Sequence, residues 1–263
     1  MDLGLAGRTA LVGGASSGLG RASADWLAGE GCRLMLWARD QAGLERVATD
    51  LRDRHASEVH VVPADATDPG TPARVAAAAL AVLGAVDILV LNAGGPPPVD
   101  PTATDRAGWN RAFQLLAITP IEIATLLLPG MRERGWGRIV AILSSGVRQP
   151  IPELVYSNAG RSALAAWMKT TARVVAADGV TINGVLPGRL RTPRIESLDQ
   201  ARAERTGRSL EQVRAESLAA IPAGRYGRPE ELGSLVAYLC SEQAAYQTGT
   251  FTAVDGGMIN ALP

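Results

Sequence analysis

Short apolar runs rich in β-branched residues alternate along the whole chain with longer segments of helical periodicity. A near-continuous apolar run such as 88–91 is typical of a strand that is covered on both faces of a sheet. Alternation of this kind requires right-handed crossovers and a parallel sheet with helices on both sides. The pattern therefore predicts an α/β fold with a doubly wound, seven-stranded parallel sheet. The predicted strands are 9–12, 33–37, 59–62, 87–91, 138–143, 181–186 and 250–254.

The amphipathic segments between these runs predict helices over 41–54, 71–83 and 155–176, with a further helix opening at Arg21. The length of 263 residues suits one domain, and we expect residues 1–263 to form it, because no repeat or linker interrupts the pattern. Residues 189–225 depart from the rhythm as a long, charged segment. Long excursions in such domains are usually lids or binding loops, so we expect a lid here, with a solvated insertion as the alternative.

Composition excludes several kinds of partner. The 26 basic and 26 acidic side chains leave no basic excess to neutralise phosphates, which argues against a nucleic-acid partner. We find no stretch of about 18 uncharged apolar residues and no signal-peptide pattern at the start, so we expect no membrane partner and a cytoplasmic protein. Two cysteines, Cys32 and Cys240, are too few for a disulfide framework or a zinc cluster. The two histidines, His55 and His60, lie in a polar stretch, where we expect solvated surface residues.

A glycine-rich segment, residues 13–20, lies between the first predicted strand and the first predicted helix. Glycines there let the backbone approach a pyrophosphate, whose charge is held by free N–H groups at the helix N-terminus. The same letters, Gly14-x-Ser16-x-Gly18, also fit the nucleophile elbow of hydrolases, which needs a histidine late in the chain. No histidine follows His60, so the segment predicts dinucleotide binding instead.

Further motifs follow the later strands in a fixed order. Together with the glycine segment they resemble the short-chain dehydrogenase/reductase superfamily, over essentially the whole chain, and this resemblance implies a Rossmann-type domain. The motifs are Gly14-x-x-x-Gly18-x-Gly20, Asp65, Asn92-Ala93-Gly94, Ser144, Tyr156, Asn183, Pro187-Gly188 with Thr192, and Val254-Asp255-Gly256-Gly257.

The resemblance implies a nicotinamide cofactor and the residues that hold it. At the end of the second strand, Ala38 stands where an acidic residue would bind the ribose of NAD. The guanidinium of Arg39 next to it favours the 2′-phosphate of NADP, partly offset by Asp40, so we expect NADP(H) to be preferred over NAD(H). The expected cofactor-binding residues are Gly14, Ser16, Ser17, Gly18, Leu19, Gly20, Arg39, Asp65, Ala66, Asn92, Ala93, Gly94, Pro187, Gly188 and Thr192.

The resemblance also implies a catalytic serine and tyrosine, for which Ser144 and Tyr156 stand at the matching places. The interval between them is one residue shorter than the family's usual one, which makes Ser145 an alternative to Ser144. The family's lysine follows its tyrosine by four residues, and that position holds Gly160. The position of the family's relay asparagine is occupied by Leu116.

Arg161 is five residues after Tyr156, which places it about 140° away around a helix. We therefore do not expect it to replace the lysine simply, and the missing charge has Arg148 or the arginines of residues 189–194 as alternative sources. Without a nearby cation, Tyr156 would form little tyrosinate at neutral pH.

These features predict a reductase that converts a carbonyl (a 3-oxoacyl thioester, ketone or aldehyde) to an alcohol with NADP(H), weakened by the loss of lysine and asparagine. The nearest activity implied by the resemblance is 3-oxoacyl-acyl-carrier-protein reduction. The alternatives are a catalytically impaired dinucleotide-binding protein and a non-redox Ser-Tyr-Arg lyase on the same fold. The resemblance further implies a homotetramer or homodimer built on helices around 114–128 and 155–176.

Overall fold

The computed structural model describes residues 2–261 and contains one seven-stranded sheet with the strand order β3-β2-β1-β4-β5-β6-β7. Every pair of neighbouring strands is parallel. The predicted doubly wound α/β fold is therefore confirmed, and each predicted strand is present. The strands are β1 (Thr9–Gly13), β2 (Arg33–Ala38), β3 (Val59–Pro63), β4 (Ile88–Leu91), β5 (Gly137–Ile142), β6 (Val180–Pro187) and β7 (Phe251–Val254).

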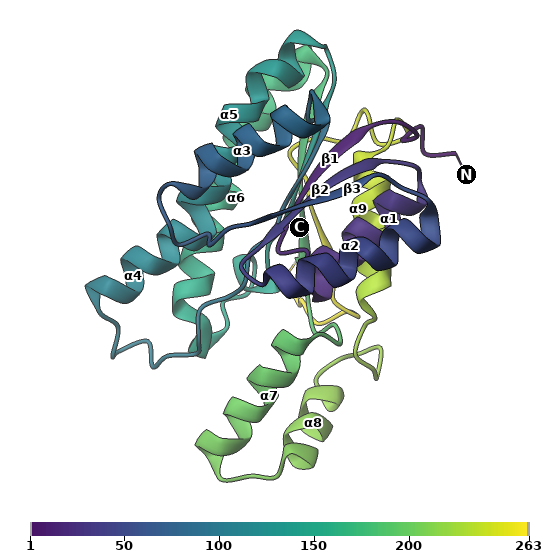
Figure 1. Ribbon diagram of the computed structural model, residues 1–263. Helices are drawn as coiled ribbons and strands as arrows, with labels where there is room; N and C mark the ends of the chain where they lie inside the picture. Colours follow the sequence, from purple (N-terminus) through teal and green to yellow (C-terminus); the bar gives the residue numbers. More distant parts are fainter. Residues whose placement is uncertain (1, 262–263) are drawn as a thin grey trace.

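Helices cover both faces of the sheet. Figure 1 shows α1, α2 and α9 on one face and α3, α5 and α6 on the other, with α7 and α8 beyond one end of the sheet. The helices are α1 (Gly18–Gly29), α2 (Gln41–His55), α3 (Thr71–Leu83), α4 (Arg106–Phe113), α5 (Thr119–Glu133), α6 (Val155–Val175), α7 (Pro193–Thr206), α8 (Leu210–Ala219) and α9 (Pro229–Cys240), with a π-helical turn η1 (Gln114–Ile118) between α4 and α5.

Two apolar cores lie on the two sides of the sheet. On one side Leu27 of α1, Leu44 of α2 and Val236 of α9 are fully buried against the strands. On the other side Ile123 of α5 and Met168 of α6 are fully buried. Burial of each such side chain stabilises the fold by about 1.5–3 kcal/mol. Both helical layers therefore hold the strands, and the loops at their carboxyl ends, in a fixed arrangement.

The predicted lid (residues 189–225) folds largely into α7 and α8, away from both cores. Asp199 of α7 is 1% exposed and is paired with Arg189 at 2.7 Å. The hydroxyl of Tyr226 donates to the second oxygen of Asp199 at 2.8 Å. These contacts join α7 to the two chain segments that connect the lid to the rest of the domain, one after β6 and one before α9.

Residues 106–133 form a helical stretch that is long and apolar enough to cross a membrane by composition alone. Ile123, Ala124, Leu127 and Met131 of this stretch belong to the core against α3 and α6. We therefore interpret the stretch as a core helix of this domain. The expected absence of a membrane partner and the cytoplasmic location stay predictions.

Candidate active site

One large cleft opens at the carboxyl ends of the strands, at the point where the chain winds away from β1 and β4 in opposite directions. Ligands of doubly wound sheets bind at this switch point. The cleft has a volume of about 1030 Å³. Of the fifteen expected cofactor-binding residues, all but Gly20 line it.

The glycine segment after β1 needs its glycines for backbone shape and close packing. Gly14 and Gly18 have φ angles of +58° and +56°, which side-chain-bearing residues rarely adopt. A Cβ on Gly14 would lie 2.6 Å from Nδ2 of the Asn92 side chain. Gly20 does not line the cleft. A Cβ on Gly20 would collide with the carbonyl oxygen of Gly14, so this position faces β1. It lets α1 pack closely on β1.

The first turn of α1 faces this cleft with its backbone donors available. Ser17 is the N-cap residue, and within the described chain its side chain makes no capping hydrogen bond. Thr192, at the start of α7, packs its methyl group 3.4 Å from where a Cβ of Gly18 would be. The diphosphate of a dinucleotide fits between these groups. The glycine segment lets it approach the backbone, the first turn of α1 offers N–H donors, and Thr192 offers a hydroxyl.

The end of the cleft near β2 and β3 carries both signs of charge. Nη1 of Arg39 lies 4.0 Å from Oδ2 of Asp65, and the Arg39 side chain is 74% exposed. Burial raises the pKa of Asp65, but hydrogen bonds from Thr67 and the charge of Arg39 outweigh it and lower the pKa overall. The carboxylate of Asp40 accepts from the backbone N–H of Gly43 at 2.9 Å and so caps α2. Arg39 is thus an exposed basic group at this end of the cleft.

Ser144 lies in the cleft, whereas Tyr156 does not. The hydroxyl oxygen of Ser144 accepts from the N–H of Gly146 at 3.0 Å. The phenol oxygen of Tyr156 accepts from the N–H of Asp105 at 3.0 Å, and its ring meets Trp109 edge-on at 4.7 Å between centroids. The structure therefore does not bring the two expected catalytic residues together, because this face of α6 packs against α4.

The next residue on α6, Ser157, points into the cleft. Successive helical residues are about 100° apart, so one position decides between the cleft and α4. Ser157 is thirteen residues after Ser144, which is the family's usual interval to its tyrosine. Reasoning from the sequence missed Ser157 because only a tyrosine was considered. The interval from Ser144 was the signal that could have found it.

Arg161, one turn after Ser157, also lines the cleft. Its Nε donates to the Ser157 hydroxyl oxygen at 3.3 Å, Nη1 to the carbonyl of Ile142 at 2.7 Å and Nη2 to that of Ala93 at 3.4 Å. Burial, followed by the charge of Arg194, lowers the pKa of Arg161 to about 10. Counted from Ser157, Arg161 stands at the lysine position. Arg161 was not expected to replace the lysine simply when counted from Tyr156, but it lines the cleft one turn after Ser157.

Gly160 and Leu116 both lie outside the cleft. A Cβ on Gly160 would be 3.0 Å from the Cβ of Leu116 and 3.3 Å from the carbonyl of Ala112. Gly160 therefore permits close approach of α6 to η1. In η1 the N–H of Thr119 bonds Gln114 five residues earlier, and Leu115, not Leu116, reaches the cleft.

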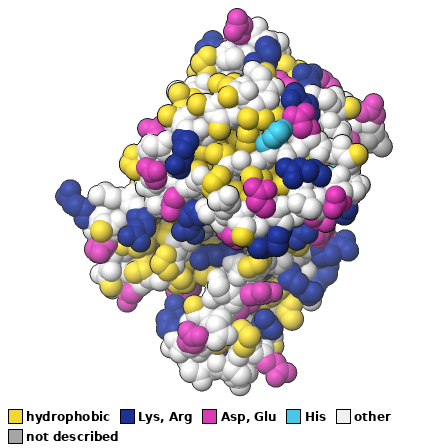
Figure 2. Space-filling view, viewed as in Figure 1, with side chains coloured by type: hydrophobic (Ala, Val, Ile, Leu, Met, Phe, Trp, Pro, Cys, Tyr) yellow, Lys and Arg dark blue, Asp and Glu magenta, His cyan; other side chains and the backbone are white. Residues whose placement is uncertain are grey.

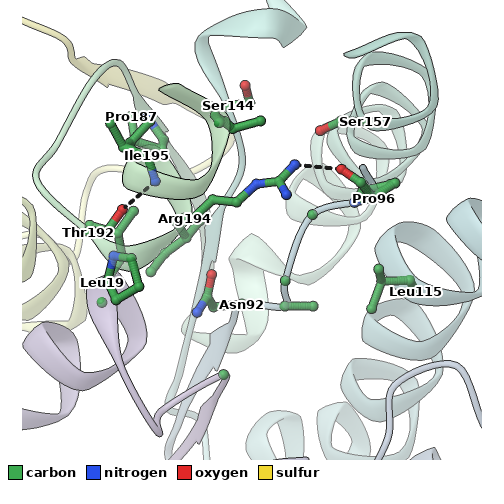
Figure 3. A pocket seen from close by; sticks show the side chains of 18 of the residues that line it. Leu19, Asn92, Pro96, Leu115, Ser144, Ser157, Pro187, Thr192, Arg194 and Ile195 are labelled. Atoms are coloured by element: carbon green, nitrogen blue, oxygen red, sulfur yellow. Dashed lines mark hydrogen bonds between the residues drawn. The ribbon is translucent and has the colours of Figure 1, made fainter. Parts of the chain in front are cut away.

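Positive side chains dominate the ionic groups around the cleft. Figure 2 shows Lys and Arg side chains gathering around the hollow between the main body and the α7–α8 pair. Figure 3 shows Arg194 of the lid reaching across the cleft towards Pro96. The cleft is thus suited to an anionic ligand. Its lining contains seven arginines (39, 111, 161, 189, 194, 202 and 205) and three acidic residues (Asp40, Asp65 and Glu153).

A doubly wound sheet with this glycine cradle defines a dinucleotide-binding protein. Residues 14–259 match the family model described as Enoyl-(Acyl carrier protein) reductase. The chain belongs to the short-chain dehydrogenase/reductase family, a family of oxidoreductases.

Similar proteins match along nearly their full lengths. Nodulation protein G of Azospirillum brasilense is 33% identical over 95% of this chain and 98% of its own. The 3-oxoacyl-(acyl-carrier-protein) reductase FabG of Vibrio cholerae is 32% identical, over 97% and 98%. The crystal structure of L-sorbose reductase from Gluconobacter frateurii with NADPH and L-sorbose covers 100% of both chains, with a TM-score of 0.94 and 32% identity.

Proposed function

We propose that this protein is an NADP(H)-dependent reductase that converts a carbonyl group to an alcohol. The observation that carries the proposal is the cleft itself, which unites the glycine cradle with Ser144, Ser157 and Arg161. NADPH, when bound, supplies a hydride to the carbonyl carbon. The similarity to reductases of 3-oxoacyl thioesters and of L-sorbose supports a carbonyl substrate.

The side chains in the cleft have complementary tasks in this proposal. Ser144 and Ser157 each accept a hydrogen bond from the protein, so each hydroxyl proton remains available for the substrate oxygen. Arg161 stabilises the negative charge that develops on this oxygen. Ser157 relays the proton from solvent to the oxygen, which replaces the role that the resemblance assigned to Tyr156.

The preference for NADP(H) rests on Arg39. Its guanidinium is exposed at the β2 end of the cleft, whereas the carboxylate of Asp40 is engaged as the cap of α2. A 2′-phosphate would meet the exposed guanidinium of Arg39, which lies 4.0 Å from the carboxylate of Asp65. The lid would cover the substrate, since Ile195 and Leu198 of α7 line the same cleft.

We also propose a homodimer or homotetramer that uses α5 and α6. Leu126 of α5 is 49% exposed and Val174 of α6 is 66% exposed, although both are apolar. Burial of these side chains between subunits would stabilise the assembly. Leu126→Asp should shift the protein to monomers in size-exclusion chromatography, and an unchanged elution volume would argue against this surface.

A catalytically impaired dinucleotide-binding protein is the second candidate. The observation that favours it is the position of Tyr156, whose hydroxyl is bonded to Asp105 outside the cleft. The same observation disfavours a Ser-Tyr-Arg lyase, because its tyrosine would have to lie in the cleft beside Ser144. Binding of NADPH without turnover of any carbonyl would support the second candidate.

The test is NADPH oxidation over a panel of ketones, aldehydes and 3-oxoacyl thioesters. Ser144→Ala and Ser157→Ala should each lower kcat by about a hundredfold or more, as expected for loss of a group that acts on the reacting oxygen. Ser162→Ala, at an exposed serine of the same helix, serves as the matched control and should leave kcat unchanged. Full activity of the Ser157 variant would refute its assigned role.

A further inference from the structure

The guanidinium groups of Arg161 and Arg194 both donate hydrogen bonds to one short backbone segment at the cleft, residues 93–96. Nη2 of Arg194 donates to the carbonyl of Pro96 at 2.5 Å, and Nη2 of Arg161 donates to the carbonyl of Ala93 at 3.4 Å. Figure 3 shows the Arg194 contact, which brings a side chain of α7 onto the loop that follows β4. The two cations are close enough for the charge of Arg194 to act on Arg161.

Neither charge is balanced by the protein. Within residues 2–261, no carboxylate oxygen lies within 4.0 Å of either guanidinium. Burial lowers the pKa of both, and the charge of Arg194 lowers that of Arg161 further. Carbonyl oxygens accept hydrogen bonds from both groups but leave two like charges in a partly buried site. Such an arrangement is stable only at a cost, which a bound anion would remove.

Three other arginines around the cleft form ion pairs with carboxylates, whereas Arg194 forms none within residues 2–261. Arg189 contacts Asp199 at 2.7 Å, and Arg205 contacts Glu153 at 2.7 Å. Arg202 contacts Glu216 at 3.2 Å. These pairs explain three lid and cleft arginines as structural. Within residues 2–261, Nε and Nη1 of Arg194 have no hydrogen-bond acceptor.

We propose that Arg194, supported by Arg161, binds an anionic group of the carbonyl substrate, either a carboxylate or a phosphate. This inference rests on the proposed reductase function and names its substrate class. The free Nε and Nη1 of Arg194 form the fork that binds two oxygens of one anion. Because Arg161 also contacts Ser157, the anion site adjoins the proposed reaction centre. A short oxo acid or oxo phosphate therefore fits better than a long acyl thioester.

The first experiment compares two matched pairs of substrates in NADPH oxidation. Acetoacetate and methyl acetoacetate differ by the carboxylate, and dihydroxyacetone phosphate and dihydroxyacetone differ by the phosphate. Arg194→Gln keeps a donor for Pro96 but removes the charge, and it should raise KM for the preferred anion by about tenfold to a hundredfold. KM for the neutral member should stay unchanged. Arg191→Gln, at an exposed neighbouring arginine outside the cleft lining, is the control and should change neither.

Two outcomes of this experiment overturn the inference. One is an equal preference of the wild-type protein for the neutral and anionic members of both pairs. The other is a loss of NADPH affinity in Arg194→Gln, measured by NADPH fluorescence, because Arg194 would then serve the cofactor phosphates. The preferred pair distinguishes a carboxylate from a phosphate.

A binding measurement separates this inference from the proposed function. Acetoacetate and dihydroxyacetone phosphate are titrated calorimetrically into the NADP⁺-saturated protein, where no hydride is available for reduction. Binding of one of them that weakens about tenfold in Arg194→Gln supports the anion site, even if no carbonyl of the panel is reduced. Absence of binding of both anions overturns the site, whether or not neutral ketones are reduced.

Discussion

Replacement of Tyr156 by phenylalanine distinguishes a structural phenol from a catalytic one. The phenol oxygen accepts the N–H of Asp105, the N-cap residue of α4, at 3.0 Å, and Gly108 leaves room for it. Removal of the hydroxyl leaves this N–H without its acceptor, while the ring keeps its contact with Trp109. The loss of one such bond costs about 1 kcal/mol in the free energy of unfolding.

For a chain of this size, about 1 kcal/mol lowers Tm by roughly 2–4 °C. The expected signature of Tyr156→Phe is therefore a lower Tm with kcat for NADPH oxidation changed less than about twofold, since the phenol lies outside the cleft. Tyr246→Phe, at a fully exposed tyrosine, is the control for the substitution itself. A kcat that falls about a hundredfold at unchanged Tm would refute the reasoning and return the catalytic role to Tyr156.

Three further predictions concern the cofactor, pH and the thiols. Arg39→Ala should raise KM for NADPH by about tenfold or more and leave KM for NADH unchanged. An equal rise of KM for both cofactors would exclude a role of Arg39 at the 2′-phosphate. The pKa of Arg161 is lowered to about 10, so its guanidinium is cationic below this pH. We therefore expect kcat to fall as the pH rises through about 10. A kcat that stays constant up to pH 11 would contradict the role of Arg161. Burial raises the pKa of Cys32 to about 12 and also raises that of Cys240, so a thiol reagent should label neither in the native protein and both after denaturation.

The fold could be predicted from the sequence because strands covered on both faces have an unmistakable apolar pattern. The apolar run 88–91 of the predicted strand 87–91 is buried at every residue, and the predicted helix 71–83 has the observed bounds. The start of α1 was misplaced by three residues, at Arg21 instead of Gly18. Glycines at 18 and 20 obscured it, since they are poor helix formers. Gly18 is needed here for its φ of +56°, and Gly20 for the close approach of α1 to β1.

The catalytic side of the site was less predictable, because it depends on how α6 is rotated. A shift of one residue turns a side chain by about 100°, and packing of Tyr156 on α4 places Ser157 and Arg161 towards the cleft. The roles of the arginines depend on long-range pairs such as Arg189 with Asp199. The composition gives the number of charged residues, but it does not show which arginines form ion pairs with carboxylates.

Isothermal titration of the purified protein with NADPH and, separately, NADH tests the central claim most directly. The cleft between the glycine segment and Thr192 predicts one binding site per chain, with NADPH bound more tightly than NADH because of Arg39. Absence of binding of either nucleotide would contradict the claim that this cleft holds a nicotinamide cofactor, and with it the proposed reduction.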